Sequence, residues 1–150
     1  MEVKICNPLK TLSFSVETTF NEMMPLVGSV ARELCAEAVA NKLDITGPVY
    51  WVYEGADGNP DTRFKLDICL PVFAPGGYSG KFKFVELPAF KCASAMHYGH
   101  WNEVGAIYHH LFDRLAEEKL EYNGVCREIY INSDFADPAN NITEVQVGVN

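Results

Sequence analysis

Valines occupy every second position near the end of the chain, in the segment Thr143–Val149. The alternation puts the valines of this segment on one face of an extended backbone and Glu144 on the other. Such a pattern predicts a strand. The upstream segment Arg127–Ile131 is predicted to be its hairpin partner.

Further segments have the alternation and the composition of strands, and residues that favour turns separate them. The turn-rich run Gly55–Pro60 predicts that two of these segments form a hairpin. The predicted strands are Thr11–Thr18, Val49–Tyr53, Arg63–Val72, Lys81–Leu87 and Phe90–Tyr98.

Two stretches have the spacing of amphipathic helices. In Met24–Ala38 the apolar residues recur every three or four positions, Thr19 and Asn21 are alternative caps, and Gly47–Pro48 ends the helical segment. In the second stretch Asn102 is the predicted cap. Its apolar stripe runs from Val104 to Leu115, and the helix is expected to continue to about Glu121, before the stop at Asn123–Gly124.

The order of predicted elements is strand, helix and hairpin, and then the same order again. A shift of 124 − 47 = 77 residues superposes the two helix stops. The shift relates Gly47 to Gly124, Val52–Tyr53 to Ile129–Tyr130, and Asp67 to Glu144.

This pattern predicts one α+β domain over residues 1–150, with an internal repeat of about 11–72 and 88–149. Two strand-helix-strand-strand units would form an antiparallel sheet with both helices packed on it. A ligand cleft is expected at their pseudo-twofold junction.

Composition narrows the classes of partner. The chain of 150 residues has 20 acidic and 12 basic side chains, a net charge of −8, and no Lys/Arg cluster. Nucleic acid and anionic membranes are therefore not expected as partners. Five scattered cysteines without a C-x-x-C spacing indicate buried thiols in a reducing cytoplasm. A cytoplasmic location also fits the absence of a signal-peptide pattern and of an apolar run long enough to span a membrane.

Glu144 is the candidate of greatest chemical interest, because a carboxylate among aromatic rings is a receptor for an organic cation. The alternative is an ordinary exposed strand glutamate. Aromatic residues on strands are likewise usually part of a core. The residues predicted to line the site with Glu144 are Trp101, Tyr53, Trp51, Tyr98, Tyr108, Tyr130, Asp67, Phe14 and Met24.

The histidines do not have the spacing of a metal site. His109 and His110 are adjacent and point apart on a helix, whereas His97 and His100 lack a nearby Cys or carboxylate pair. Neither a metal nor a cofactor is expected.

Several of these motifs resemble the GyrI-like family, which includes the effector-binding domains of bacterial multidrug-sensing activators and stand-alone gyrase-inhibitor-like proteins. The resemblance rests on His97–Trp101 before a helix that contains Tyr108, on Arg127–Ile131, and on Thr143–Val147. It implies a duplicated fold with a ligand cleft between its halves. It also implies that Glu144 is the acidic ligand-binding residue.

The resemblance implies three functions. The leading one is binding of lipophilic, often cationic small molecules, for sequestration or sensing. The second is hydrolysis of strained, electrophilic cyclopropane-type natural products with the same glutamate, and the third is a gyrase-inhibitor-like protein-binding module. Because the DNA-binding helices of the regulators have no counterpart in the sequence, no direct transcriptional role is expected. The sequence leaves open whether the protein is a monomer or a homodimer.

Overall fold

The computed structural model describes every residue from Met1 to Asn150. The elements, in chain order, are β1 (Glu2–Cys6), β2 (Leu9–Thr18), α1 (Met23–Val27), α2 (Val30–Ala40), β3 (Tyr50–Glu54), β4 (Phe64–Pro71), β5 (Lys83–Leu87), β6 (Phe90–Tyr98), the 3-10 helix η1 (Trp101–Glu103), α3 (Val104–Glu117), β7 (Tyr122–Asn132), the 3-10 helix η2 (Pro138–Asn140) and β8 (Ile142–Val149).

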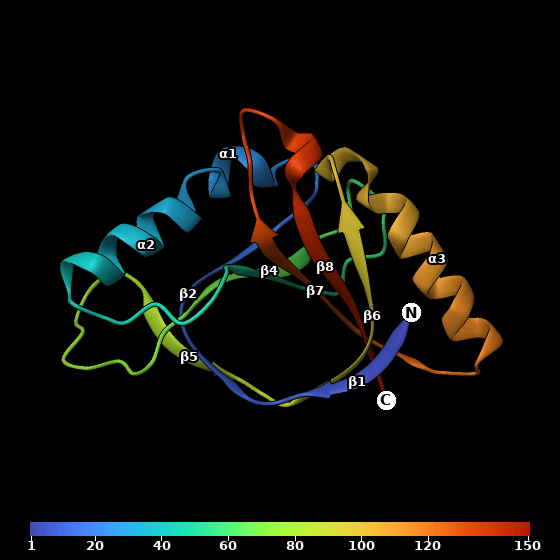
Figure 1. The fold of residues 1–150 in the computed structure, drawn as a ribbon, viewed down its shortest axis with the longest axis horizontal. Helices are drawn as coiled ribbons and strands as arrows, with labels where there is room; N and C mark the ends of the chain where they lie inside the picture. Colours follow the sequence, from blue (N-terminus) through green and yellow to red (C-terminus); the bar gives the residue numbers. More distant parts are fainter.

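The strands form a single antiparallel sheet in the order β1-β6-β8-β7-β3-β4-β2-β5. The sheet is strongly curled into a half-barrel (Figure 1). Only two residues separate β1 from β2, and only two separate β5 from β6. β1 pairs with β6, and β2 pairs with β5. The stretch β1–β2 and the stretch β5–β6 therefore run side by side across the open side of the curl.

The predicted α+β class, the antiparallel sheet and its two packed helices are confirmed. Both predicted hairpins are present, β3 with β4 and β7 with β8. The element order β2, α2, β3, β4 in the first half recurs as β6, α3, β7, β8 in the second. This recurrence supports our proposal that the two halves are copies of one unit.

The predicted first helix is divided into α1 and α2, with Gly28 and Ser29 between them. Glycine and serine are weak helix formers, and Pro25 removes a backbone donor from the preceding turn. The second helix ends at Glu117, earlier than expected, because Lys119 has the left-handed φ of 57°. β1 was not predicted; it pairs with β6 at the edge of the sheet.

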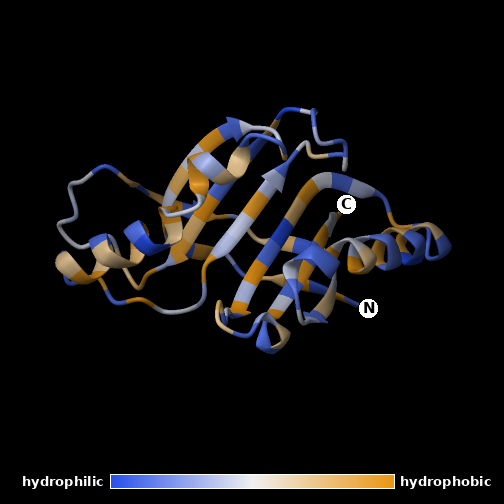
Figure 2. Ribbon diagram, turned by 90° about the horizontal axis from the view of Figure 1, so that it is seen from above, coloured by the Kyte–Doolittle hydropathy of each residue, from blue (hydrophilic) through white to orange (hydrophobic).

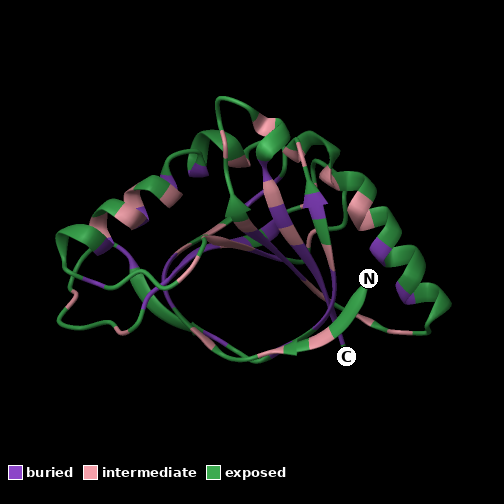
Figure 3. Ribbon diagram, viewed as in Figure 1, coloured by how far each residue is buried: buried purple, intermediate pink, exposed green.

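Both long helices lie over one face of the sheet, and we call this the outer face. α2 packs against β2 and β4, and α3 packs against β6 and β8. The buried residues of each helix lie on the side that faces the strands (Figure 3). Leu34 of α2 and Leu111 of α3 have no solvent-exposed surface. Apolar and polar residues alternate along the strands and along α3, as expected for elements with one buried side (Figure 2).

The opposite face of the sheet, which we call the inner face, lines the inside of the curl and carries several polar side chains. Arg127 is only 3% exposed there. Its guanidinium lies over the Phe90 ring, 4.0 Å from the ring centroid, and Nη2 donates to the Pro88 carbonyl at 3.3 Å. This side chain therefore ties β7 to the stretch that crosses the open side of the curl.

Glu144 also lies on the inner face and binds β1 to the sheet. Its carboxylate accepts hydrogen bonds from Lys4, from Ser94 Oγ at 2.7 Å and from Gln146 Nε2 at 3.0 Å. Burial alone would raise the pKa of Glu144, but these hydrogen bonds and the charge of Lys4 outweigh burial and lower it.

The three α-helices are too short or too polar to span a lipid bilayer.

We expect Glu144→Gln to reduce the free energy of unfolding by on the order of 1 kcal/mol at neutral pH, because Lys4 loses its ionic partner. Since the folded-state pKa is lowered, this stabilisation is present above the unfolded-state pKa of about 4.3. It is lost as the pH falls through the lower folded-state value. Urea unfolding of parent and variant at pH 7 and at pH 3 measures the difference, which should shrink at the lower pH. Equal stabilities at pH 7 would contradict the assignment.

Candidate ligand-binding site

The antiparallel pairing of β3 with β7 gathers aromatic and acidic side chains on the outer face of the sheet. Trp51 lies directly opposite Glu128, and Tyr53 lies opposite Cys126. Because side chains alternate along each strand, Tyr130 shares this face with Glu128. These residues form the floor of a cavity between the sheet and the helices.

The cavity has a volume of about 660 Å³, which is in the range that holds drug-sized molecules. Thirteen of its 17 lining residues are hydrophobic, so we call it the aromatic cavity. α1 and α2 supply one wall, which includes Met23 and Met24. On α2 the small residue Ala31 faces the cavity, next to Gly28 just before the helix. Small residues at this wall leave room for a ligand against the helix.

Glu128 is the acidic group of the aromatic cavity and is 9% exposed. The Tyr108 hydroxyl donates to Oε1 at 2.8 Å, and the Tyr130 hydroxyl donates to Oε2. Burial raises the pKa of the Glu128 carboxyl, and the two tyrosine hydrogen bonds offset this only in part. Burial and the adjacent carboxylate raise the pKa of both tyrosines well above the usual value, so their hydroxyls stay protonated and donate.

A continuous series of rings lines the aromatic cavity. The Trp51 and Tyr130 centroids are 5.7 Å apart, those of Tyr130 and Trp101 are 5.9 Å apart, and those of Trp101 and Phe135 are 5.5 Å apart. All three contacts have edge-to-face geometry, which favours rigid packing. The Trp101 Nε1 atom is buried and has no hydrogen-bond partner.

Local backbone geometry explains why Trp101 and Phe135 reach the aromatic cavity. Gly99 has a φ of 116°, a conformation that favours glycine, and it turns the chain from β6 into η1 directly before Trp101. Phe135 lies in the connection between β7 and β8, where Asp134 accepts hydrogen bonds from the backbone of Ala136 and Asp137. Phe135 is 77% exposed, so it lies at the mouth of the cavity.

Some of the residues predicted for the site are in the cavity lining and others lie elsewhere. Tyr108 contacts Glu128 from behind the lining, Phe14 packs in the core against Phe82, and Tyr98 is 68% exposed. The predicted residues that line the aromatic cavity are Trp51, Tyr53, Trp101, Tyr130 and Met24.

In the structure Glu144 does not line the aromatic cavity, and its role as the ligand-binding acid stays a prediction. On β8 the outer face carries Thr143, Val145 and Val147, so Glu144 points into the curl and is held by Lys4. Asp67 occupies the same face, with a carboxylate oxygen 3.5 Å from Lys65 Nζ.

Sequence reasoning did not select Glu128, Phe20 or Phe135. A signal for Glu128 was present, because the 77-residue shift that lays Tyr53 on Tyr130 also lays Trp51 on Glu128. Period-two alternation then puts Glu128 beside Tyr130 on one face. No comparable pattern marks Phe135, because its position depends on the path of a loop.

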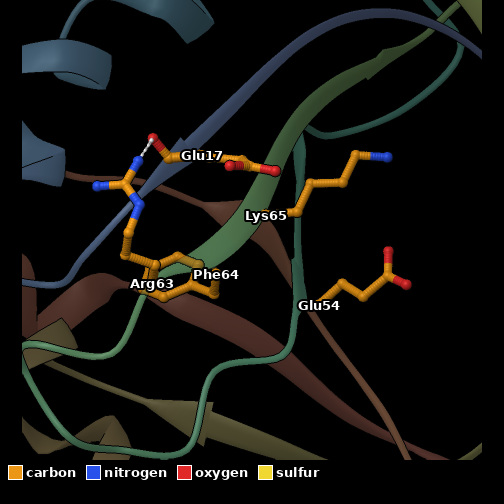
Figure 4. A pocket seen from close by; sticks show the side chains of 5 residues that line it. All are labelled: Glu17, Glu54, Arg63, Phe64 and Lys65. Atoms are coloured by element: carbon orange, nitrogen blue, oxygen red, sulfur yellow. Dashed lines mark hydrogen bonds between the residues drawn. The ribbon is translucent and has the colours of Figure 1, made fainter.

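A separate depression of about 490 Å³ lies where β2, β3 and β4 meet, and polar side chains surround it. Arg63 Nη2 donates to the Glu17 carbonyl at 3.2 Å, whereas the side chains of Glu54 and Lys65 extend away from that contact (Figure 4). Apart from buried Phe64, its lining residues are exposed, with no buried polar group to position a ligand. No group of three or more His, Cys, Asp or Glu side chains has a geometry that could hold a metal ion.

The chain was compared with protein-family models, with curated protein sequences and with solved structures. A family model described as a GyrI-like small molecule binding domain matches residues 1–150. Comparison with curated protein sequences finds no significant match.

Several solved structures share the fold. The C-terminal domain of EcmrR has 21% sequence identity and a TM-score of 0.77, and the match covers 99% of this chain and 96% of that one. SAV2435 bound to tetraphenylphosphonium has 13% identity and a TM-score of 0.66, with coverage of 100% and 94%. A hydrolase encoded by lin2189 from Listeria innocua has 14% identity and a TM-score of 0.67, with coverage of 99% and 91%.

We expect the stability of Glu128→Gln, relative to the parent, to increase as the pH rises from about 4 toward 8. The folded-state pKa of Glu128 is raised, so the parent loses stability as the pH rises through it, whereas the uncharged amide does not. Thermal melts of both proteins across this range measure the effect. A melting-temperature difference that stays constant with pH would contradict the raised pKa.

Proposed function

This chain belongs to the family of GyrI-like small molecule binding domains, and on that basis we propose that it binds lipophilic, cationic molecules in the aromatic cavity. Glu128, not Glu144, is the residue that we assign to the positive charge of the ligand. The observation that carries the proposal is a buried carboxylate in a cavity whose other lining groups are mostly apolar.

A carboxylate out of contact with water is destabilised, and the raised pKa of Glu128 reflects this cost. A cation that enters the cavity restores charge balance, and each well-placed contact with a ring adds about 0.5–2 kcal/mol. Trp51 and Trp101 offer the most favourable ring faces for such contacts.

The tyrosine hydroxyls also restrict the chemistry of the ligand. Each Glu128 oxygen already accepts a hydrogen bond from a tyrosine, and these bonds hold the carboxylate in one orientation. A ligand with a delocalised or alkylated cation needs no additional hydrogen bond from this carboxylate. The neighbour with bound tetraphenylphosphonium supports this ligand class through likeness of fold.

Hydrolysis is a second candidate function, and the protonation properties of Glu128 favour it. A carboxyl with a raised pKa is suited to general acid or base catalysis. In this role Glu128 would accept a proton from a water molecule whose oxygen attacks an electrophilic cyclopropane carbon. The ring C–C bond to that carbon breaks, and the carbon that keeps the electron pair takes up a proton, so the product is the substrate plus one water molecule. The Listeria innocua neighbour that is named as a hydrolase supports this candidate through likeness of fold.

Tetraphenylphosphonium is expected to quench the intrinsic tryptophan fluorescence of the protein, because both tryptophans of the chain line the aromatic cavity. Glu128→Gln should weaken the affinity about tenfold or more, which corresponds to roughly 1.4 kcal/mol. Affinity in the parent should rise with pH as Glu128 ionises, whereas the affinity of the variant should not.

Glu144→Gln provides the matched control for this titration, since it makes the same chemical change on the inner face. It should bind the cation as tightly as the parent does. If the Glu144 variant loses binding and the Glu128 variant keeps it, the assignment of the carboxylate is wrong. The absence of saturable quenching in the parent would contradict the proposed function itself.

The hydrolase candidate requires turnover. Incubation of the parent with an electrophilic cyclopropane compound should then give a product heavier by one water molecule, which mass spectrometry detects. Glu128→Gln should abolish product formation and Glu144→Gln should not. A compound that stays unchanged after hours with the parent would count against hydrolysis of that class.

A further inference from the structure

The aromatic cavity contains a second charged residue. Among its lining residues only Glu128 and Arg32 have an acidic or a basic side chain. Glu128 lies on the sheet and is almost fully buried, whereas Arg32 is on α2 and is exposed. The two charges, of opposite sign, therefore lie at different depths, one at the floor and one at the rim.

Arg32 has no ionic partner within the protein. Its helical neighbours three and four positions away are Gly28, Ser29, Cys35 and Ala36, and none of them is acidic. The other two exposed arginines differ in this respect, since Arg63 and Arg114 each lie within 4.0 Å of a glutamate oxygen. In a chain with a net charge of −8, an arginine without a carboxylate at the mouth of a cavity is available to a ligand.

The position of Arg32 follows from the spacing of α2. Gly28, Arg32 and Cys35 recur at intervals of four and three residues and lie along the same side of the cavity. Gly28 lies just before α2, whereas Arg32 and Cys35 lie on it, and all three are in the lining of the cavity. The guanidinium is a planar donor that matches a carboxylate in a bidentate arrangement.

We propose that the preferred ligands are bipolar: a lipophilic body carries a cationic group at the inner end, toward Glu128, and an anionic or carboxylate group at the outer end, toward Arg32. This inference rests on the proposed function, because it concerns the same cavity. It adds a second recognition point and makes Arg32 a determinant of specificity. Zwitterionic aromatic compounds would be bound more tightly than cations of the same shape that lack the acid.

Rhodamine 110 and rhodamine 123 make a matched pair of probes, because the first has a free carboxylate and the second has its methyl ester on the same xanthylium cation. Both are titrated with the parent protein, with Arg32→Gln and with Arg114→Gln, and dye fluorescence anisotropy gives each Kd. Arg114 on α3 is an exposed arginine outside the cavity and serves as the control.

We expect the ratio of the Kd for rhodamine 110 to the Kd for rhodamine 123 to rise about fivefold in Arg32→Gln, as expected for an exposed ion pair. Arg114→Gln should leave this ratio unchanged. The effect should diminish in 1 M salt, because the rim is open to solvent. Glu128→Gln should weaken the binding of both dyes.

The outcomes separate the two proposals. If both dyes bind the parent and the ratio does not change in Arg32→Gln, the bipolar ligand is excluded while the cation site stands. An equal change in the Arg114 variant would also overturn the inference, because the effect would then be one of net charge. If neither dye binds the parent protein, both the cation site and the bipolar ligand fail.

Discussion

The antiparallel pairing of β3 with β7 is the constraint on which the rest of the structure depends. It joins the hairpin β3–β4 to the hairpin β7–β8 at the middle of the curled sheet. Its register fixes Trp51 opposite Glu128 and sets the floor of the aromatic cavity. A slip of one residue would turn Trp51 and Tyr53 into the curl, and the floor of the cavity would lose these two rings.

Two glutamates on neighbouring strands show how strongly the strand face decides the role of a side chain. Glu144 has Lys4, Ser94 and Gln146 around it and stabilises the sheet. Glu128 is buried without a salt bridge, and burial outweighs the two tyrosine hydrogen bonds and the charge of His97, so in its charged form it costs stability. Residues that lower the stability of the fold in this way are typical of sites for binding or catalysis. The same residue type therefore contributes to folding on one side of the sheet and to the proposed function on the other.

Much of the fold could be predicted from the sequence because the strands alternate cleanly and the turns contain glycine and proline. The site was predicted only in part. Alternation shows that Glu144 and Val145 lie on opposite faces, but it does not show which face meets the helices. Both faces of this sheet are partly covered, the outer one by helices and the inner one by the curl. No local sequence pattern predicts the buried position of Arg127, because its partners Pro88 and Phe90 are far from it in the sequence. The same is true of Phe135, whose place is set by a loop.

The curl of the sheet also limits how the protein can associate with other molecules through its strands. Only β1 and β5 are edge strands, and each is five residues long. Each continues within two residues into a stretch that is paired on both sides, and each carries charged side chains. Short, charged and bent edges are poor templates for an added strand. A protein with so much of its chain in strands thus exposes little backbone from which edge-to-edge aggregation or fibril growth could start.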